Sequence, residues 1–583
     1  MVKGLGIDLG TTFSCVAYID ENQNPIVLKN AEGNATTPSV VYFESQENIV
    51  VGEVAKQSLV SEPDNTVAFI KRDMGKIDDE TKAPIMRTIH GISMSPQEIS
   101  AKILTKIVKD ANAELRKIGK LSDGNPDIKD VVITCPAYFG MAEREATKAA
   151  GKIAGLNVMN IIPEPTAAAL NYAHVNKGKE QTVMVYDLGG GTFDVTIIEV
   201  HDGIPRVICT DGSHTLGGKD WDDALVQYFA EKYIEEKGED PRENLDILQE
   251  LFLKAEQTKI TLSNRESAPI MIIGDSGRIN FTMTRNEFDE KTKDLLERSI
   301  SYTDKCLKIA AAKKYGKDIE AITNEEINKY LHEELTDILL VGGSSKMPQV
   351  SKLIQSKYGI KAKEADLDEA VAKGAAICAS NDYVEFSEED WQLVKKSVGE
   401  QDYDFVKEAI QEGNESIIKQ YEDVLPRHMV QKQESRGMIF TNVSPRTYGT
   451  AAYESSSRDK LVIFNFIKRN DELPQKQTLM FYTMDEGQVG VDIDVYESFT
   501  MSAKAELEEG NKIGSGILEF PNSMPKGTPI EITLRMNSAG LLEVSAFHKE
   551  TNSMYNGTFD VSNSLSTEET KRAIERNKHQ SFN

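Results

Sequence analysis

The sequence predicts an α/β protein with a duplicated core, followed by an all-β domain. Two copies of one pattern, a short apolar strand that ends in Asp-Leu-Gly and turns tightly into a second strand, begin at Gly4 and at Val183. Strands then alternate with helical stretches as far as Ser380, which is typical of α/β folds. After Met438 the pattern changes to short strands separated by turn signals, which favours a β-sandwich.

Each copy of the repeated pattern contains three strands. We expect them at residues 4–8, 13–19 and 25–29, and again at residues 183–187, 192–200 and 204–210. Two copies of one supersecondary unit predict two lobes of similar topology. The capping box Ser95-Pro96-Gln97-Glu98 opens the first clear helix. Apolar spacing and caps predict helices at residues 96–117, 141–154, 244–261, 287–314, 346–358 and 368–380.

The remainder of the chain divides into three parts. Residues 382–437 are acidic, with candidate helices at 391–398 and 403–425. Strands are expected at residues 459–467, 478–484, 489–496, 530–536 and 541–547. A last capping box begins at Ser566 and opens a helix. The predicted domains are therefore residues 1–381, 382–437, 438–563 and 564–583.

Composition excludes several classes of function. The 583 residues carry 67 Lys and Arg against 93 Asp and Glu, a net charge of −26, which disfavours nucleic acid as a partner. No run approaches the ~18 apolar residues of a membrane span, and the N-terminus has no signal-peptide pattern, so we expect a cytoplasmic protein without membrane partners. Five scattered cysteines and eight histidines form neither a disulfide framework nor a zinc motif.

The glycine turns carry the chemical signal. Glycine lets backbone N–H groups approach a phosphate, and the adjacent hydroxyls of Thr11, Thr12 and Thr192 can donate to its oxygens. Asp8 and Asp187 end the preceding strands and can hold hydrated Mg²⁺. One such turn alone is usually a simple hairpin, but two copies can clamp one triphosphate from opposite sides. A third strand–Gly-Gly–helix junction, residues 341–346, points backbone amides at an anion or a nucleoside.

These motifs occur in an order that resembles one known family. The motifs are DLGTT at 8–12, PAYF at 136–139, EPTAAA at 164–169, DLGGGTFD at 187–194, LGG at 216–218 and DEAVA at 368–372. Together they resemble the seventy-kilodalton heat-shock chaperones of the DnaK type. The resemblance is strong over about the first 380 residues and weaker over roughly 438–570, where it rests on NVSP at 442–445 and LLEVSA at 541–546.

The resemblance implies an actin-like, duplicated ribonuclease-H-like ATPase domain of two lobes that binds Mg-ATP and ADP in its cleft, followed by a β-sandwich that binds peptides. The implied catalytic residues are Lys71, Glu164, Asp187, Thr192 and Asp194, with Asp8 and Asp187 holding the metal through water. The implied nucleotide-binding residues are Gly10, Thr11, Thr12, Phe13, Gly189, Gly190, Gly191, Gly217, Gly218, Glu256, Lys259, Ser263, Gly342, Gly343, Ser344, Lys346 and Asp368. Pro136 and Arg144 match the pair that passes the nucleotide signal to the interdomain linker, and Tyr453, Met484 and Val491 match the peptide cleft.

The implied function is that of an ATP-dependent molecular chaperone of the stress response. It binds extended hydrophobic segments of unfolded proteins and hydrolyses ATP slowly, with a nucleotide exchange factor as a further partner. The alternative is a weakly hydrolysing or non-hydrolysing scaffold of the same family. A small-molecule kinase or a filament of the actin-like superfamily is disfavoured by the family-like β-domain.

Four departures from the family pattern shape these expectations. The acidic segment stands where the family has an apolar linker, which predicts weak coupling between ATP and peptide. Asn160 replaces the arginine that meets the J-domain partner, so ordinary stimulation by that partner is not expected. Lys346 replaces the arginine that stacks on adenine. Residues 564–583 match only the start of the family's helical lid, which predicts an open peptide cleft.

Overall fold

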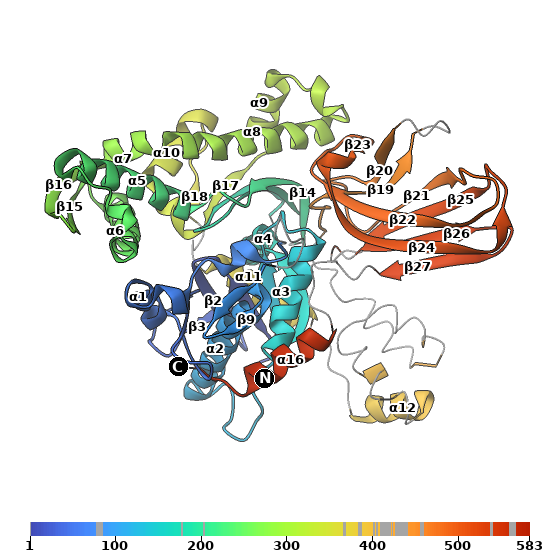
Figure 1. Cartoon of the computed structure of the whole chain (residues 1–583), viewed down its shortest axis with the longest axis horizontal. Helices are drawn as coiled ribbons and strands as arrows, with labels where there is room; N and C mark the ends of the chain where they lie inside the picture. Colours follow the sequence, from blue (N-terminus) through green and yellow to red (C-terminus); the bar gives the residue numbers. More distant parts are fainter. Residues whose placement is uncertain are drawn as a thin grey trace.

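The computed structural model describes residues 2–76, 85–176, 179–201, 204–364, 369–382, 388–399, 403, 406–407, 421, 424–425, 441–454, 460–536, 540, 542–558 and 567–582. Figure 1 shows a large α/β part, coloured blue to yellow, and an orange β-sandwich beside it. We call residues 2–176 lobe I and residues 179–364 lobe II. None of the described helices is long and apolar enough to cross a bilayer.

Lobe I is built on a sheet of strand order β11-β10-β1-β2-β3, with β4 also paired to β2. The strands are β1 (Leu5–Leu9), β2 (Phe13–Ile19), β3 (Pro25–Leu28), β4 (Thr36–Pro38), β10 (Asp130–Cys135) and β11 (Asn157–Pro163). A smaller sheet and a hairpin add β5 (Val41–Phe43), β6 (Asn48–Val51), β7 (Thr66–Val67), β8 (Arg87–Ile89) and β9 (Ile92–Met94). The helices are α1 (Glu53–Ser61), α2 (Pro96–Lys117), α3 (Met141–Ile153) and α4 (Glu164–Val175).

Lobe II repeats this plan with the strand order β14-β13-β12-β17-β18. The strands are β12 (Gln181–Leu188), β13 (Phe193–His201), β14 (Ile204–Ser213), β17 (Asp337–Val341) and β18 (Lys363–Glu364), with the hairpin β15 (Ser267–Gly274) and β16 (Gly277–Thr284) at the far end. The helices are α5 (Gly218–Lys237), α6 (Leu245–Asn264), α7 (Arg285–Lys291), α8 (Lys293–Tyr315), α9 (Asn324–Glu333) and α10 (Pro348–Tyr358).

The duplication that the two Asp-Leu-Gly motifs predict is visible in the pairing of the strands. In each lobe three antiparallel strands are followed by two parallel ones: β1 pairs antiparallel with β2 and parallel with β10, and β12 pairs antiparallel with β13 and parallel with β17. Asp8 and Asp187 occupy equivalent places near the ends of β1 and β12. The topology therefore brings the two motif turns to the same side of the two sheets.

Helices α4 and α11 (Ala370–Asp382) connect the lobes through a core of alanine, valine and leucine. A Cβ atom placed on Gly374 would lie 1.7 Å from the carbonyl oxygen of Ala167. Only glycine permits this approach, because real Cβ atoms essentially never come so close to a backbone oxygen. On its other side α11 packs Ala372 and Ala376 against β2. The small residues of α11 thus allow this helix to pack closely against α4 and against β2, which holds the two lobes close together.

The C-terminal domain is a sandwich of two antiparallel sheets, ordered β23-β20-β19-β22-β24 and β21-β25-β26-β27. Its strands are β19 (Thr447–Tyr453), β20 (Leu461–Ile467), β21 (Gln475–Tyr482), β22 (Gln488–Ser498), β23 (Lys504–Glu506), β24 (Gly510–Met524), β25 (Pro529–Met536), β26 (Leu542–His548) and β27 (Ser553–Thr558). Inward residues such as Ile493, Leu534 and Val544 form its core. Helix α12 (Glu388–Val398) precedes the sandwich, and α16 (Thr567–Lys578) and β28 (Ser581–Phe582) follow it.

Several expected boundaries are wrong. The single helix expected at 287–314 is two helices, because Thr292 has non-helical dihedrals and its buried hydroxyl donates to the Phe288 carbonyl at 2.8 Å. The helix expected at 346–358 begins at Pro348, after a 3-10 turn at Gly343–Lys346. The long strand β24 was not expected at all. Most of the helix expected at 403–425 lies outside the described residues.

The sandwich is docked on the α/β part near β14 (Figure 1). Arg469 donates to the Asp211 carboxylate at 2.8 Å, and these side chains are only 3% and 2% exposed. The Thr210 amide donates to the side chain of Asn470 at 2.8 Å. Met141, at the start of α3, joins the apolar cluster of the sandwich. The two parts therefore share a buried interface with both polar and apolar contacts.

We expect this docking to weaken as pH rises through neutrality. Burial and the nearby Glu143 carboxylate raise the pKa of Glu497 to about 7, although Arg446 opposes them. An undocked Glu497 regains an ordinary, lower pKa, so docking takes up a proton and is favoured at low pH. Docking should be about tenfold weaker at pH 8 than at pH 6. Hydrogen–deuterium exchange of the Thr210 amide at both pH values measures the change. Glu497→Gln should remove this dependence, and an unchanged dependence in that variant would contradict the assignment.

Candidate functional site

A cleft of about 960 Å³ opens between the two lobes. Most residues that the sequence assigns to a phosphate or nucleoside site line it. They are Asp8, Gly10, Thr11, Thr12, Phe13, Lys71, Glu164, Asp187, Gly189, Gly190, Thr192, Glu256, Lys259, Ser263, Gly342, Gly343, Ser344 and Lys346. Gly191, Gly217, Gly218 and Asp194 lie in the wall just behind this lining, whereas Asp368 lies outside the described residues.

The two glycine turns meet at the base of the cleft. A Cβ atom on Gly190 would lie 1.8 Å from the Thr12 hydroxyl oxygen, and one on Gly191 would lie 2.4 Å from the Thr11 methyl group. Glycine is therefore needed here for the turn of lobe II to approach the turn of lobe I. The Thr12 hydroxyl is buried and has no hydrogen-bond partner among the described residues. An unsatisfied donor at this point is suited to an oxygen-rich ligand.

Lys71 projects into the base of the cleft from a short 3-10 turn, Ile70–Asp73. The preceding Phe69 has a left-handed φ of 59°, a conformation that costs a non-glycine residue roughly 1 kcal/mol or more. Lys71 is 6% exposed and forms an ion pair with Glu164, the first residue of α4. Burial lowers the pKa of Lys71, but the charges of Glu164 and Asp8 outweigh it and raise the pKa overall. Lys71 is therefore held as an ammonium ion.

Carboxylates outnumber this one ammonium. Burial and the charge of Glu164 raise the pKa of both Asp187 and Asp194 well above the ordinary value, and Asp8 adds to the effect on Asp187. Asp8 itself accepts a hydrogen bond from Thr134 at 3.1 Å. Four carboxylates and one lysine leave a local excess of negative charge, which suits a divalent cation. Among the residues that the structure describes, no group of three or more His, Cys, Asp or Glu side chains is arranged as a metal site by itself.

Gly342 brings the third glycine motif against the carboxylates. Its φ of 81° lies in the left-handed region, and a Cβ atom there would lie 2.5 Å from Oδ1 of Asp187. Only glycine fits this conformation and this contact at once. The following turn, Gly343–Lys346, leads into α10, and Lys346 is exposed on the cleft wall. The junction therefore lines one side of the cleft with backbone and short side chains.

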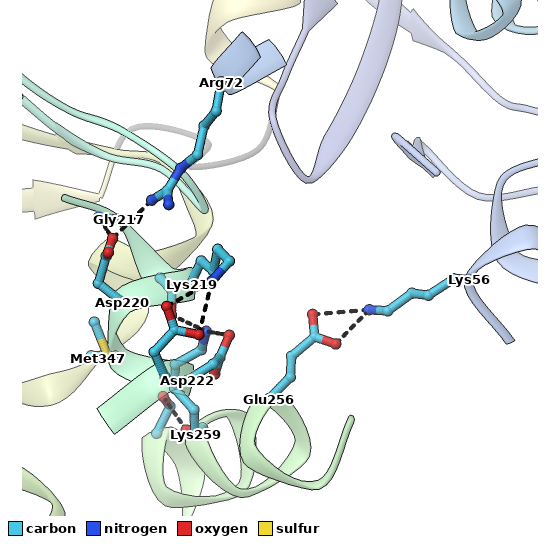
Figure 2. A network of polar contacts seen from close by, with 12 residues as sticks. Lys56, Arg72, Gly217, Lys219, Asp220, Asp222, Glu256, Lys259 and Met347 are labelled. Carbon is cyan, nitrogen blue, oxygen red and sulfur yellow. Dashed lines mark hydrogen bonds and ion pairs between the residues drawn. The ribbon is translucent and has the colours of Figure 1, made fainter. Parts of the chain in front are cut away.

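Helix α6 lines the opposite wall with Glu256, Lys259 and Ser263. Figure 2 shows Lys259 turned toward Asp222, with a distance of 2.7 Å between Nζ and the carboxylate. Burial raises the pKa of Asp222 to about 6, although Lys259 opposes the shift. Ser263 donates its hydroxyl to the Lys259 carbonyl at 3.0 Å. Glu256 pairs with Lys56 at 2.7 Å, so all three predicted polar groups are already engaged with the protein.

Two basic residues that join the lobes were not singled out from the sequence as contacts. Lys56 of α1 reaches Glu256 of α6 at 2.7 Å across the mouth of the cleft (Figure 2). Arg72 donates to the Gly191 carbonyl at 2.9 Å and to Asp220 at 2.8 Å. No sequence spacing relates residues so far apart, so these contacts become visible only in the fold. Each of them ties lobe I to lobe II and limits opening of the cleft.

Pro136 and Arg144 both form hydrogen bonds with the backbone of Phe139. Pro136 follows β10, and its carbonyl accepts from the Phe139 amide at 3.2 Å. Arg144 of α3 is 5% exposed and donates to the Phe139 carbonyl at 2.9 Å. Its side chain also lies near Gly540 of the sandwich. Phe139 therefore connects the two predicted residues and Arg144 also approaches the sandwich, while their role in passing a nucleotide signal stays a prediction.

The three predicted peptide-binding residues lie in the sandwich, away from that interface. Tyr453 ends β19 and is 41% exposed. Val491 lies on the neighbouring strand β22, and Met484 lies in the connection between β21 and β22. Met484 and Val491 are half-buried, and Val491 packs partly against the sandwich core. Tyr453 and Val491 therefore lie in the same sheet, and the side chains of all three residues remain at least partly accessible to solvent.

Comparison with known proteins gives matches along nearly the whole chain. A family model described as Hsp70 protein matches residues 4–394 and 427–582. The chaperone protein DnaK of Thermotoga neapolitana is 35% identical over 98% of this chain and 82% of its own length. The protein of the same name from Thermosipho melanesiensis is also 35% identical, again over 98% and 82% of the two chains. The DnaK of Thermotoga petrophila is 34% identical over the same shares.

The family match has a gap in the interdomain segment. The match omits residues 395–426 but resumes at 427, so it includes the apolar Met438-Ile439-Phe440 directly before the sandwich. The match therefore does not assign the family's linker to particular residues, and the expectation that the acidic segment replaces it stays a prediction. Thr441, the first described residue after it, pairs with β14, where its amide donates to the Pro205 carbonyl at 3.0 Å.

Proposed function

The chain belongs to the Hsp70 family, and from this premise we propose that it is an ATP-hydrolysing chaperone that binds extended apolar segments of unfolded polypeptides. One observation carries the proposal. Two glycine turns of duplicated lobes meet beside the buried Lys71–Glu164 pair, at the base of a cleft of about 960 Å³. This arrangement suits a nucleoside triphosphate with its phosphates at the base and its nucleoside between α6 and the 342–346 turn.

In this proposal the chain's residues act by positioning and by charge. Asp8 and Asp187 would hold Mg²⁺ through water, and this ion would supply neutralisation of phosphate charge. The Lys71 ammonium, fixed by Glu164, orients the attacking water and stabilises charge that develops on the γ-phosphate. Thr192 donates to that phosphate, and Asp194 would complete the group of carboxylates that holds the metal. The turns with Thr11 and Thr12 hold the remaining phosphate oxygens.

The nucleoside is assigned to the outer part of the cleft. Glu256, Lys259 and Ser263 face the sugar and base from α6, and Gly342, Gly343, Ser344 and Lys346 face them from the other wall. Because Glu256 is bound to Lys56 and Lys259 to Asp222, nucleotide binding must share or replace these contacts. The outer cleft is therefore expected to adjust more than the phosphate base when the nucleotide enters.

We expect Lys346→Arg to tighten binding of ATP. A planar guanidinium can stack on a purine, whereas an ammonium cannot, and such a contact is worth roughly 0.5–2 kcal/mol. Calorimetry on both forms should give a dissociation constant about 2- to 30-fold lower for the arginine variant. The exposed Lys352→Arg on α10 is the matched control. Equal or weaker binding by Lys346→Arg would mean that residue 346 does not face the base.

The proposed function is tested by the ATPase rate with and without an unfolded peptide. A chaperone of this type should hydrolyse ATP slowly, and an extended apolar peptide should stimulate the rate severalfold. Single-turnover hydrolysis distinguishes it from the alternative, a nucleotide-binding scaffold that hardly turns over. ATP binding without measurable hydrolysis would favour the scaffold. Absence of ATP binding would contradict both.

The proposed function also implies binding partners and a cellular compartment. We expect unfolded chains and a nucleotide exchange factor as partners, and the cytoplasm as the compartment. Asn160, on β11, is half-buried and offers an uncharged amide where an arginine would make a charged contact. Ordinary J-domain stimulation is therefore not expected of this chain. Because the acidic segment 382–437 stands where the family has its apolar linker, we expect ATP to change the rate of peptide release little.

A further inference from the structure

The turn that carries Lys71 meets a cation from the other lobe. Phe69 precedes this turn with a left-handed φ of 59°, and its ring lies at the cleft with its centre 6.0 Å from the Lys219 ammonium of α5. We propose that Phe69 is a positioning residue, whose ring is held by the Lys219 cation and keeps the turn in the conformation that directs Lys71 to the base of the cleft. The inference rests on the proposed ATP hydrolysis and adds to it a link between closure of the lobes and the place of Lys71.

The conformation of Phe69 needs support from outside its own turn. Residues with a Cβ atom rarely adopt a left-handed φ, and they keep it only where the surrounding structure fixes them. The Phe69 carbonyl accepts a hydrogen bond from the Arg72 amide at 3.0 Å, which closes the 3-10 turn. That bond is local to the turn and does not hold the Phe69 ring. The contacts of the ring therefore decide whether the strained conformation persists.

Lys219 is fixed within lobe II before it meets the Phe69 ring. Its Nζ atom lies 2.6 Å from the Asp223 carboxylate and 5.6 Å from the centre of the Phe252 ring on α6. Its amide donates to the Gly190 carbonyl at 2.7 Å, which ties the start of α5 to the second glycine turn. The ammonium therefore has a defined place on the wall of lobe II, where it attracts one aromatic ring from each lobe.

The residue that follows Lys71 contacts the same part of lobe II. Arg72 donates to the Gly191 carbonyl at 2.9 Å and to the Asp220 carboxylate at 2.8 Å (Figure 2). Lys71 is therefore flanked on both sides by residues that contact either the second glycine turn or the start of α5. Two contacts on opposite sides of one lysine fix the orientation of the turn as well as its position.

This arrangement links the place of Lys71 to closure of the cleft. The Phe69 ring belongs to lobe I and the Lys219 cation belongs to lobe II, so the contact between them exists only while the lobes are closed. When the lobes separate, the strained residue loses its support and the turn can relax to an ordinary conformation. We therefore expect Lys71 to occupy its proposed catalytic place only in the closed form.

Lys219→Met tests the positioning role, because methionine keeps the length of the side chain and removes the cation. Single-turnover ATP hydrolysis should slow about two- to thirtyfold, the range expected for loss of one cation–π contact, whereas ATP affinity measured by calorimetry should change far less. Lys219→Arg keeps a cation over the ring and should recover most of the lost rate. Lys232→Met is the matched control, because Lys232 of the same helix lies 5.8 Å from the centre of the Tyr228 ring within lobe II. It should change neither quantity.

Two variants of Phe69 separate the ring from the backbone strain. Leucine lacks the aromatic ring but keeps the strain, so Phe69→Leu should slow hydrolysis about as much as Lys219→Met. Glycine adopts a positive φ without a steric penalty, so Phe69→Gly should slow hydrolysis less than Phe69→Leu. In the Phe69→Gly background, Lys219→Met should add nothing, because no strained residue is left for the cation to hold.

Hydrogen–deuterium exchange without nucleotide distinguishes failure of this inference from failure of the proposed function. In Lys219→Met, the Arg72 amide should exchange about two- to thirtyfold faster than in Lys232→Met, because the turn that it closes is less populated. Faster exchange in a chain that does not hydrolyse ATP would contradict the proposed function and support the contact between Phe69 and Lys219. Equal exchange in the two variants, or equal rates of hydrolysis by them, would overturn the inference.

Discussion

Replacing Lys71 with alanine should lower the single-turnover rate of ATP hydrolysis by about 10²–10³-fold, the usual cost of removing one preorganised charge from a transition state. ATP affinity should change far less, because the proposed contact with the γ-phosphate strengthens only as charge develops. Lys71 is suited to this role because it is 6% exposed and fixed by Glu164 at the base of the cleft. Rapid-quench hydrolysis and calorimetric binding together measure the two quantities.

Two further variants make this result specific. Lys120→Ala removes an exposed lysine of the same lobe, paired with Glu21 at 2.7 Å, and should leave both quantities unchanged. Glu164→Gln keeps the shape of the partner but removes its charge, so it should slow hydrolysis without matching the effect of Lys71→Ala. Hydrolysis by Lys71→Ala at a near-natural rate would exclude Lys71 from catalysis. Loss of ATP binding together with hydrolysis would instead make Lys71 a ground-state ligand.

Much of the architecture could be predicted because local patterns coincide with real element boundaries. The strand at Phe13–Ile19 and the helix at Pro96–Lys117 lie where the sequence predicts them, since a tight turn and a capping box mark their ends. The repeated Asp-Leu-Gly turn predicted the duplication of strand order. The residues that the sequence assigned to phosphate binding do line one cleft, because glycine, threonine and aspartate at strand ends are recognisable in the local sequence.

Elements that depend on tertiary contacts could not be predicted. β24 contains Gly510, Gly514 and Gly516, which weaken a strand pattern, yet a Cβ on Gly516 would lie 2.2 Å from the Tyr555 ring. Glycine at 516 makes room for Tyr555 of β27 in the facing sheet and does not form a turn. The helix break at Thr292 depends in part on Gln349 of α10, whose side chain donates to the Thr292 hydroxyl at 3.1 Å. Nothing local to residue 292 indicates that partner.

The same reasoning applies to the site and to the end of the chain. Lys56 and Arg72 act across the cleft on residues from the other lobe, so no window of sequence contains both partners. The capping box near Ser566 predicted a helix correctly, and α16 begins at Thr567, while Ser566 itself lies outside the described residues. The surface on which this helix lies was not predictable, because Lys102 is more than 450 residues away from its partner Asn577.

Replacing Arg469 with alanine should release the sandwich from the α/β part. Arg469 and Asp211 are 3% and 2% exposed, and removing one partner of a buried ion pair typically costs 3–5 kcal/mol because the other charge stays buried. Lys305 also lies 3.2 Å from Asp211, so we expect the lower end, about 3 kcal/mol, or roughly a hundredfold shift toward the undocked form. Small-angle scattering should show a larger radius of gyration, and the Thr210 amide should exchange faster.

A double-mutant cycle separates this ion pair from general damage to the sandwich. Arg535→Ala removes a half-exposed side chain of β25 that lies 3.8 Å from Glu543 of the same sheet, and it should leave docking unchanged. Asp211→Ala should release the sandwich as well, but the double variant should lose little more than either single one, because the second change removes a charge that is already unpaired. Strictly additive losses would mean that the two side chains act independently. The docked arrangement would then depend on its apolar contacts at Met141 and on the backbone pairing of Thr441, and the ion pair would set only the orientation of the two parts.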